Sequence, residues 1–275
     1  MFNGDSIGGF GENWRRIFSA LAALVFIFCG CGDNSQTGTK KILIVAVDAT
    51  LAPMSFISDD GAIAGFEPDL MRAIGREAGF AVELINVEWA GLFGGLITGK
   101  YDMAVSSITI LDERKKRMAF SVPYLTSGLA LVVRKDMEGV GSLDDIETQK
   151  LLVGAQVGTT AYFYLEKKPG IRKKGYQAYG HAVTDMINGK IDAVVGESTG
   201  TLYYKNQNKE YFQKIRMVGE IMTQEFYGIA MRKDDALLLE KVNAALRVLI
   251  NNGAAQALHD KWELGRAASV PRLEQ

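Results

Sequence analysis

Cysteine and histidine are both scarce in this chain of 275 residues, which contains two of each. The cysteines, Cys29 and Cys31, lie near the N-terminus, so the body of the chain can form neither a disulfide framework nor a cysteine-based metal site. The histidines, His181 and His259, are too few for a histidine-rich metal site. We therefore expect a protein without a metal ion or other cofactor.

Neither sign of charge is in excess, because 31 Lys and Arg residues stand against 32 Asp and Glu residues, for a formal net charge of −1. Proteins that bind nucleic acid usually carry a basic patch, so nucleic acid is not an expected partner. The sequence also lacks a Gly-x-Ser-x-Gly motif, a P-loop and, in its body, a Cys–His pair. These absences favour a protein that binds a ligand, since binding requires none of these motifs.

The N-terminal segment resembles a bacterial lipoprotein signal peptide. Two arginines precede an apolar stretch of 12 residues, 17–28, which is short for a bilayer span. Cys31 follows a small residue, as the lipid-bearing cysteine of a lipobox does, although phenylalanine replaces the usual leucine three positions before it. An alternative site for the lipid is Cys29. The alternatives to a lipoprotein are a cleaved signal without lipid and an uncleaved anchor. We expect residues 1–31 to be the signal peptide, residues 32–40 a flexible tether, and the protein to be periplasmic or at the cell surface, held to the membrane by lipid.

From residue 41 onward, apolar runs with strand character alternate with helical patterns. Residues 41–47, KILIVAV, form a continuous apolar run that is typical of a strand buried on both faces. A helix with acids and proline in its first turn is predicted after Gly65 and ends at Gly79. The order predicts an α/β fold with parallel-rich sheets. Further predicted elements are a strand at 81–87, a helix at 89–97, a strand at 101–105, a second α/β series after 128, and closing helices at about 235–250 and 253–262.

Residues 104–125 carry the strongest chemical signal. The end of a predicted strand is followed by the hydroxyls of Ser106, Ser107 and Thr109, and then by a charged run that contains Arg114. A guanidinium is planar and always charged, so it can hold a carboxylate by two parallel hydrogen bonds while hydroxyls fill the remaining acceptor sites. The alternative is a solvated helix start, with acids first and bases after them, as the helix dipole favours.

Seven short motifs follow one another in order between about residues 41 and 265. This order and spacing resemble the family-3 periplasmic solute-binding proteins, the amino-acid receptors of ABC importers. Each motif alone is weak evidence, whereas the series is specific for the family. The motifs are Asp48 after the first strand and residues 65–70, 101–104, 109–124, 154–160, 191–194 and 227–230.

The resemblance implies the type II periplasmic binding protein fold, which has two α/β lobes joined by two crossovers. The first lobe would combine residues 41–128 with 227–270, and the second would comprise residues 134–221. The hinges would lie at about 128–133 and 221–227. The ligand would bind between the lobes, and a hinge motion would close them around it.

The resemblance also assigns roles to individual residues. Arg114 would bind the α-carboxylate of the ligand, helped by Thr109 and Thr160. The backbone around Ser107 and the carboxylate of Glu197 would receive the α-amino group. An acid is needed there because an ammonium taken out of water requires a paired partner.

Four further positions would contact the side chain of the ligand. Trp89 matches an aromatic wall, with a core tryptophan as the alternative. Leu51 stands where relatives often have a second aromatic ring, so the pocket would be roomier. Asp48 and Ser106 favour a polar or basic amino acid, although Asp48 could instead accept local backbone N–H groups at a strand end. Gln156 and Thr159 complete the predicted ligand-binding set.

The sequence thus predicts a monomeric, non-enzymatic receptor that captures a free amino acid and delivers it to an ABC-transporter permease. Two alternatives use the same fold. One is a periplasmic cyclohexadienyl or arogenate dehydratase in which Glu197 acts as the general acid. The other is a sensory ligand-binding protein, which requires no different cleft.

Overall fold

The structure is a computed structural model that describes residues 40–202 and 209–273. The predicted signal peptide, with Cys29 and Cys31, and most of the predicted tether lie outside the described residues. The described residues belong to one compact unit. Within the described part of the chain, no helix is long and apolar enough to cross a membrane, and no group of three or more His, Cys, Asp or Glu side chains could hold a metal ion.

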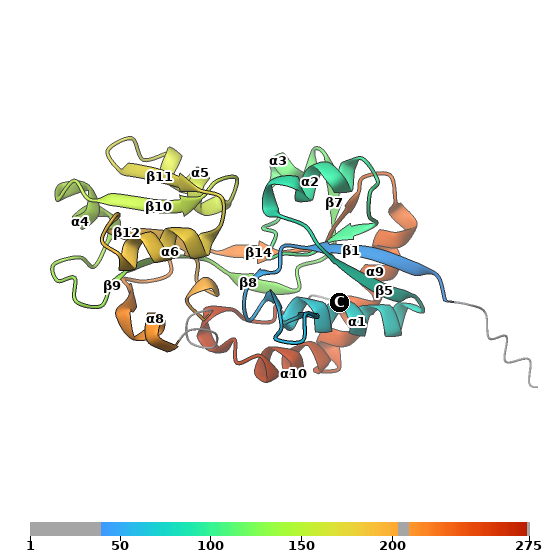
Figure 1. The fold of residues 1–275 in the computed structure, drawn as a ribbon. Helices are drawn as coiled ribbons and strands as arrows, with labels where there is room; N and C mark the ends of the chain where they lie inside the picture. Colours follow the sequence, from blue (N-terminus) through green and yellow to red (C-terminus); the bar gives the residue numbers. More distant parts are fainter. Residues whose placement is uncertain (1–39, 203–208, 274–275) are drawn as a thin grey trace, which may run out of the picture. The chain divides into compact units, whose positions relative to one another are not determined.

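The first of two five-stranded sheets draws its strands from both ends of the described chain (Figure 1). The strand order is β5-β1-β6-β15-β7, in which β1 pairs in parallel with β5 and β6, and β15 pairs antiparallel with β6 and β7. The elements of this part are β1 (Ile42–Val47), β2 (Thr50–Leu51), β3 (Ser55–Ile57), β4 (Ile63–Ala64), α1 (Phe66–Ala78), β5 (Ala81–Asn86), α2 (Trp89–Ile97), β6 (Met103–Ala104), α3 (Asp112–Lys115), β7 (Met118–Phe120), β15 (Ala230–Arg232), α9 (Ala236–Asn251), α10 (Ala254–Lys261) and the 3-10 helix Gly265–Ala267.

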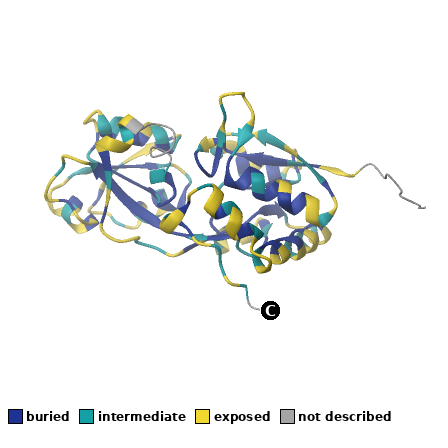
Figure 2. Ribbon diagram, turned by 90° about the horizontal axis from the view of Figure 1, so that it is seen from below, coloured by how far each residue is buried: buried dark blue, intermediate teal, exposed yellow. Residues whose placement is uncertain are grey.

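Helices cover both faces of this sheet, which explains the continuous apolar run in β1. Leu43, Val45 and Val47 belong to a hydrophobic cluster with residues of α1 and α9, whereas Ala46 belongs to a cluster with residues of α2. Successive side chains of a strand point to opposite faces, so a strand covered on both sides needs apolar residues at every position. Figure 2 shows the strands mostly dark blue, while exposed positions gather on the outer faces of helices and in loops.

The second sheet has the order β11-β10-β12-β9-β13. Its central strands β10 and β12 are parallel, and β9 pairs antiparallel with β12 and β13. Residues of α4 and α5 pack against one face of this sheet and residues of α6 against the other. The elements are β9 (Leu129–Arg134), α4 (Leu143–Thr148), β10 (Leu152–Gln156), α5 (Thr160–Glu166), β11 (Arg172–Tyr176), α6 (Tyr179–Ile187), β12 (Ala193–Glu197), α8 (Lys209–Lys214) and β13 (Ile215–Val218).

Two short strands carry the chain between the two sheets. β8 (Leu125–Ser127) and β14 (Glu225–Tyr227) pair antiparallel as a separate two-stranded sheet. The two crossings touch just beyond it, because a Cβ atom at Gly128 would lie 1.9 Å from the carbonyl oxygen of Thr223. The hinge predicted at about 128–133 overlaps Gly128 and most of β9, which pairs within the second sheet.

The structure confirms the α/β class, and several predicted elements keep their limits. α1 ends directly before Gly79, whose φ of 80° places it in the left-handed region, and its N–H donates to the carbonyl of Gly75. Glycine adopts that conformation without a steric cost. The two closing helices also lie close to their predicted positions.

Candidate functional site

Arg114 is buried, although it belongs to a charged run. Only 9% of its surface is exposed, whereas its neighbours Glu113 and Lys115 are exposed. Nη1 donates to the carbonyl of Thr109 at 2.9 Å, and Nη2 donates to the carbonyl of Gly158 at 3.2 Å. The alternative of a solvated helix start fits the exposed neighbours of Arg114 but not the buried Arg114 itself. The side chain instead reaches from α3 to the loop before α5.

Two aromatic rings and two carboxylates surround this guanidinium. Cζ lies 5.5 Å from the ring centroid of Trp89 and 5.0 Å from that of Phe93, within the range of cation–π attraction. Burial lowers the pKa of Arg114 to about 10, and the negative charges of Glu197 and Glu225 oppose that shift. Arg114 therefore remains charged at neutral pH and is positioned to bind an anion.

Glu225 is a central residue of this site that the sequence analysis did not identify. The side chain is 6% exposed, and Oε2 accepts hydrogen bonds from Thr109 Oγ1 at 2.6 Å and Thr160 Oγ1 at 3.0 Å. Strand alternation could have identified it, because Glu225 and the fully buried Tyr227 lie on the same face of β14. The carboxylate thus joins two threonines that sequence reasoning placed in the ligand site.

Glu197 lies at the carboxyl end of β12, as predicted, and remains partly accessible although many protein atoms surround it. Burial raises the pKa of Glu197 to about 7, and the charge of Glu225 raises it further, while Arg114 acts in the opposite direction. A carboxyl group with this pKa is partly protonated at neutral pH. Its ionised form can bind a cation, and its protonated form can donate a proton.

Ser107 adopts a rare backbone conformation that a buried carboxylate maintains. Its φ is 47°, and its N–H and Oγ donate to Oε1 of Glu67 at 2.5 and 3.2 Å. Glu67 is 0% exposed and also accepts from the hydroxyls of Ser55 and Tyr124. Burial raises the pKa of Glu67, and these hydrogen bonds oppose the shift. Glu67 stands in the first turn of α1, as the sequence suggested, and additionally fixes Ser107.

Asp48 binds groups of its own part of the chain. One carboxylate oxygen accepts from Thr50 Oγ1 at 2.7 Å and the other from the N–H of Trp89 at 3.0 Å. Its own N–H donates to Ser106 Oγ at 3.3 Å. Burial raises the pKa of Asp48, with the two hydrogen bonds acting against it. These contacts match the alternative of a strand-end aspartate and also orient the start of α2.

Leu51, Gln156 and Thr159 have clear structural surroundings. Leu51 packs against one hydrophobic cluster of each five-stranded sheet. Gln156 Nε2 donates to the carbonyl of Gln177 at 2.9 Å. Thr159 caps α5, since its Oγ1 accepts from the N–H of Tyr162 and donates to the carbonyl of Gln156. Thr159 therefore sets the position of the residue that follows it, Thr160.

One cavity of about 990 Å³ joins several of these groups. Thr109, Arg114 and Thr160 line it together with Glu225, and Phe93 and Phe163 add aromatic surface. The structure thus places three predicted residues around one space, whereas Asp48, Trp89, Ser107 and Glu197 are not part of that lining.

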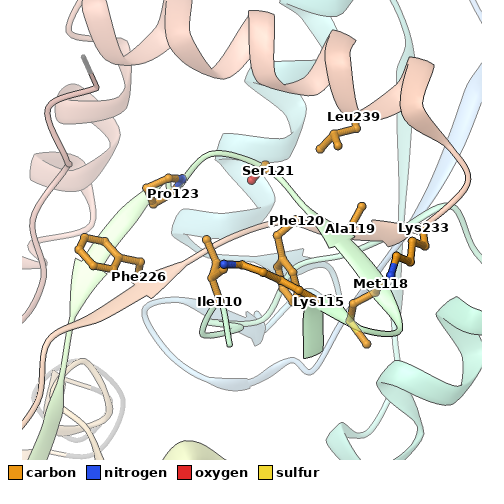
Figure 3. Close-up of a pocket in the computed structure, with 10 residues that line it drawn as sticks. All are labelled: Ile110, Lys115, Met118, Ala119, Phe120, Ser121, Pro123, Phe226, Lys233 and Leu239. Atoms are coloured by element: carbon orange, nitrogen blue, oxygen red, sulfur yellow. The ribbon is translucent and has the colours of Figure 1, made fainter. Parts of the chain in front are cut away.

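A second cavity, of about 740 Å³, contains no predicted ligand residue (Figure 3). Apolar side chains such as Phe120, Phe226 and Leu239 dominate its wall, and Lys115 and Lys233 lie at its border. Lys115 pairs with Asp112, and Lys233 donates to the carbonyl of Lys116. The groups suited to binding an amino acid therefore belong to the first cavity and its surroundings.

Comparison with known proteins agrees with this geometry. The model of the bacterial extracellular solute-binding proteins, family 3, matches residues 43–265. The L-cystine-binding protein TcyJ of Escherichia coli (strain K12) is 31% identical over 237 residues, which cover 86% of this chain and 87% of that protein.

Two solved structures are also similar. An ancestral arginine-binding protein bound to arginine has 34% identity and a TM-score of 0.75, over 81% of this chain and 98% of that one. An ancestral amino-acid-binding protein described as a precursor of cyclohexadienyl dehydratase has 32% identity and a TM-score of 0.73, over 80% of this chain and 95% of that one. The fold, the spacing of the site and the family match lead to one conclusion: this chain belongs to the family-3 bacterial extracellular solute-binding proteins.

Proposed function

We propose that this protein captures a free amino acid outside the cytoplasm and delivers it to the permease of an ABC transporter. The observation that carries the proposal is the buried, charged Arg114, which lines one cavity with the hydroxyl-bearing Thr109 and Thr160. A guanidinium with adjacent hydroxyls suits a carboxylate, the group that all amino acids share. The names of relatives that bind cystine or arginine support this class of ligand.

In the proposed complex, Arg114 binds the α-carboxylate and Glu197 binds the α-ammonium. The pKa of Glu197, about 7, allows the carboxyl group to ionise when a positive charge arrives. The backbone of Ser107 offers a further partner for the ammonium, and Trp89 forms an aromatic wall. Asp48, Leu51, Ser106, Gln156 and Thr159 lie around the side chain, which we infer to be polar or basic.

We propose that the ligand is enclosed by a hinge motion of two lobes. The lobes are those that the sequence predicted, 41–128 with 227–270 and 134–221. Figure 1 supports this division, because each part has its own sheet and β8 and β14 run between them. A monomer suffices for this mechanism, since every proposed ligand contact comes from one chain.

We propose that a lipid on Cys31 anchors the protein to the membrane. Replacing Cys31 with serine should release the protein from the membrane fraction, while the matched Cys29→Ser variant should stay there. The opposite pattern would assign the lipid to Cys29.

A dehydratase is the second candidate, because a carboxyl group with a pKa of about 7 is suited to act as a general acid. The similarity of this chain to an ancestral amino-acid-binding protein described as a precursor of cyclohexadienyl dehydratase adds weight to this second candidate. Turnover of prephenate or arogenate that is lost in Glu197→Gln would establish this activity. Reversible binding of an amino acid without product would exclude it.

A thermal-shift screen of the exported protein tests the main proposal. The ligands are the twenty amino acids, ornithine, citrulline and prephenate. A ligand that binds only the folded state raises the unfolding midpoint as its concentration exceeds the dissociation constant. A large shift with one or a few amino acids is the expected result. No shift with any amino acid, with or without a shift by prephenate, would contradict it.

A further inference from the structure

Glu225 holds the same two hydroxyls that the proposed function assigns to the ligand carboxylate. Its Oε2 accepts from Thr109 Oγ1 at 2.6 Å and from Thr160 Oγ1 at 3.0 Å, and its Oε1 accepts from Thr223 Oγ1 at 3.3 Å. Glu225, Thr109 and Thr160 are 6%, 4% and 9% exposed. A carboxylate of the protein itself thus satisfies donors that suit a carboxylate of the ligand.

These hydrogen bonds connect three separate parts of the chain. Glu225 lies on the crossing strand β14, Thr109 follows β6 of the first sheet, and Thr160 is the first residue of α5, which packs against the second sheet. Arg114 makes a parallel connection, because its Nη1 and Nη2 bind the carbonyls of Thr109 and Gly158. Side chains of the protein itself therefore link the groups of the two sheets.

A ligand carboxylate cannot simply join this arrangement. A hydroxyl has one proton, so each threonine can donate to Glu225 or to the ligand but not to both. Two carboxylates at the same hydroxyls also repel each other, and Arg114 supplies a single positive charge that Glu197 shares. Entry of a ligand carboxylate at Thr109 and Thr160 therefore requires Glu225 to move away.

We propose that Glu225 is an internal competitor of the ligand carboxylate at this site. It holds the hydroxyls of Thr109 and Thr160, stabilises contact between the two parts of the chain, and lowers the affinity because an incoming carboxylate must displace it. This inference rests on the proposed function, because it assumes that the ligand has a carboxylate. A state that excludes the ligand reduces the apparent affinity by the fraction of molecules that occupy it.

The first test is Glu225→Gln, which preserves the size of the side chain and removes its charge. Isothermal titration with L-arginine and with L-cystine should give a dissociation constant about tenfold lower than that of the wild type. This change corresponds to about 1.4 kcal/mol of binding free energy. A residue that only supports the fold would leave the affinity unchanged or weaken it. Either of those results, with a wild type that binds, would overturn the proposal.

Thr160→Val provides a second variant that does not alter Glu225. If both carboxylates use the Thr160 hydroxyl, its loss should weaken binding more in the Glu225→Gln background than in the wild type. In the wild type the substitution also removes a competing hydrogen bond to a charged acceptor, which is stronger than the bond to the neutral amide of Glu225→Gln. The two substitutions should therefore be non-additive. Equal effects of Thr160→Val in both backgrounds would contradict the competition.

A measurement without ligand separates this inference from the proposed function. Small-angle X-ray scattering of ligand-stripped protein should give a larger radius of gyration for Glu225→Gln than for the wild type, because a link between the two parts has been weakened. An unchanged radius would overturn the inference even if amino acids bind. If the wild type bound no amino acid while Glu225→Gln still expanded, the proposed function would fail and the linking role of Glu225 would stand.

Discussion

Glu67 and Glu225 are both buried carboxylates that accept hydrogen bonds from hydroxyl groups, but their donors differ in origin. Those of Glu67, which include Ser55 and Tyr124, belong to the part of the chain built on the first sheet. Those of Glu225 include Thr109 from the first part and Thr160 from the second. A carboxylate whose donors lie in one part fixes that part, whereas one with donors in two parts can respond to a change between them.

The accessible surface around the two carboxylates supports this distinction. Glu67 is completely buried and belongs to the packed interior between α1 and the first sheet. Glu225 lines the cavity of about 990 Å³ together with Arg114. A water molecule or a ligand group can therefore reach the partners of Glu225 more readily than those of Glu67.

The largest effect is expected on stability at Glu67. In Glu67→Ala, the hydroxyls of Ser55 and Tyr124 and the N–H of Ser107 lose their acceptor inside a dry interior. Each unsatisfied buried donor costs about 1–3 kcal/mol, so the free energy of unfolding should fall by about 4 kcal/mol in a urea titration. The matched Glu225→Ala should cost clearly less. Equal losses in the two variants would remove the distinction between them.

The next effect concerns ligand binding through Arg114. Arg114→Ala should weaken the binding of every amino acid about 100-fold, because truncating one partner of a buried charge pair costs about 2–5 kcal/mol. Lys116→Ala is the control, since Lys116 is exposed, lies two residues further on and is not part of the lining of the cavity. Titration calorimetry compares the two variants. Similar affinities of both would contradict the assignment of the carboxylate.

The pH dependence of the free energy of unfolding should then report the titration of Glu197. Its pKa is about 7 in the folded protein against an ordinary value of 4.5, so between these two pH values the folded state binds more protons than the unfolded state. The free energy of unfolding should therefore fall as the pH rises through this window. We expect the unliganded wild type to lose about 2 kcal/mol relative to Glu197→Gln between pH 4.5 and pH 8, in urea titrations at both values.

The same group should link binding to pH with the opposite sign. A ligand ammonium favours the ionised carboxylate, so the affinity of the wild type should increase as the pH rises through about 7, with release of protons on binding. The affinity of Glu197→Gln should vary less. If the free energy of unfolding and the affinity changed with pH in the same way in the wild type and in Glu197→Gln, Glu197 would not titrate in this window.

The smallest effect is expected at Trp89. Trp89→Leu removes the aromatic wall that we propose for the ligand and one cation–π partner of Arg114, so binding should weaken about tenfold in the same titration. Trp262→Leu is the control, because Trp262 packs against Phe56 at a ring distance of 5.9 Å and donates to Asp69. That variant should lose stability and keep its affinity. Loss of affinity in the control alone would place the aromatic wall elsewhere.

Local patterns were sufficient to predict much of the fold. The apolar run of β1 and the proline and glycine at the ends of α1 are signals within a few residues, and the structure places these elements accordingly. The first crossing has no such local signal. An apolar strand such as β9 has the same pattern in a hinge as in a sheet, so only pairing with β12 and β13 distinguishes the two.

The site was predicted in part for the same reason. Arg114 was predicted because its own neighbours carry hydroxyls. Glu225 was not, since its partner Thr109 is 116 positions away in the sequence. Helical spacing could have indicated the burial of Glu67, because Glu67, Leu70 and Ile74 share one face of α1 and are all buried.

The central claim is that Arg114 binds the α-carboxylate of an amino acid, and one set of titrations tests it directly. The wild type and Arg114→Ala are each titrated with the amino acid that binds best and with its α-carboxamide, which lacks the negative charge. We predict that the wild type strongly prefers the amino acid and that Arg114→Ala prefers neither, since the two changes remove the same interaction. An undiminished preference in Arg114→Ala would contradict the account.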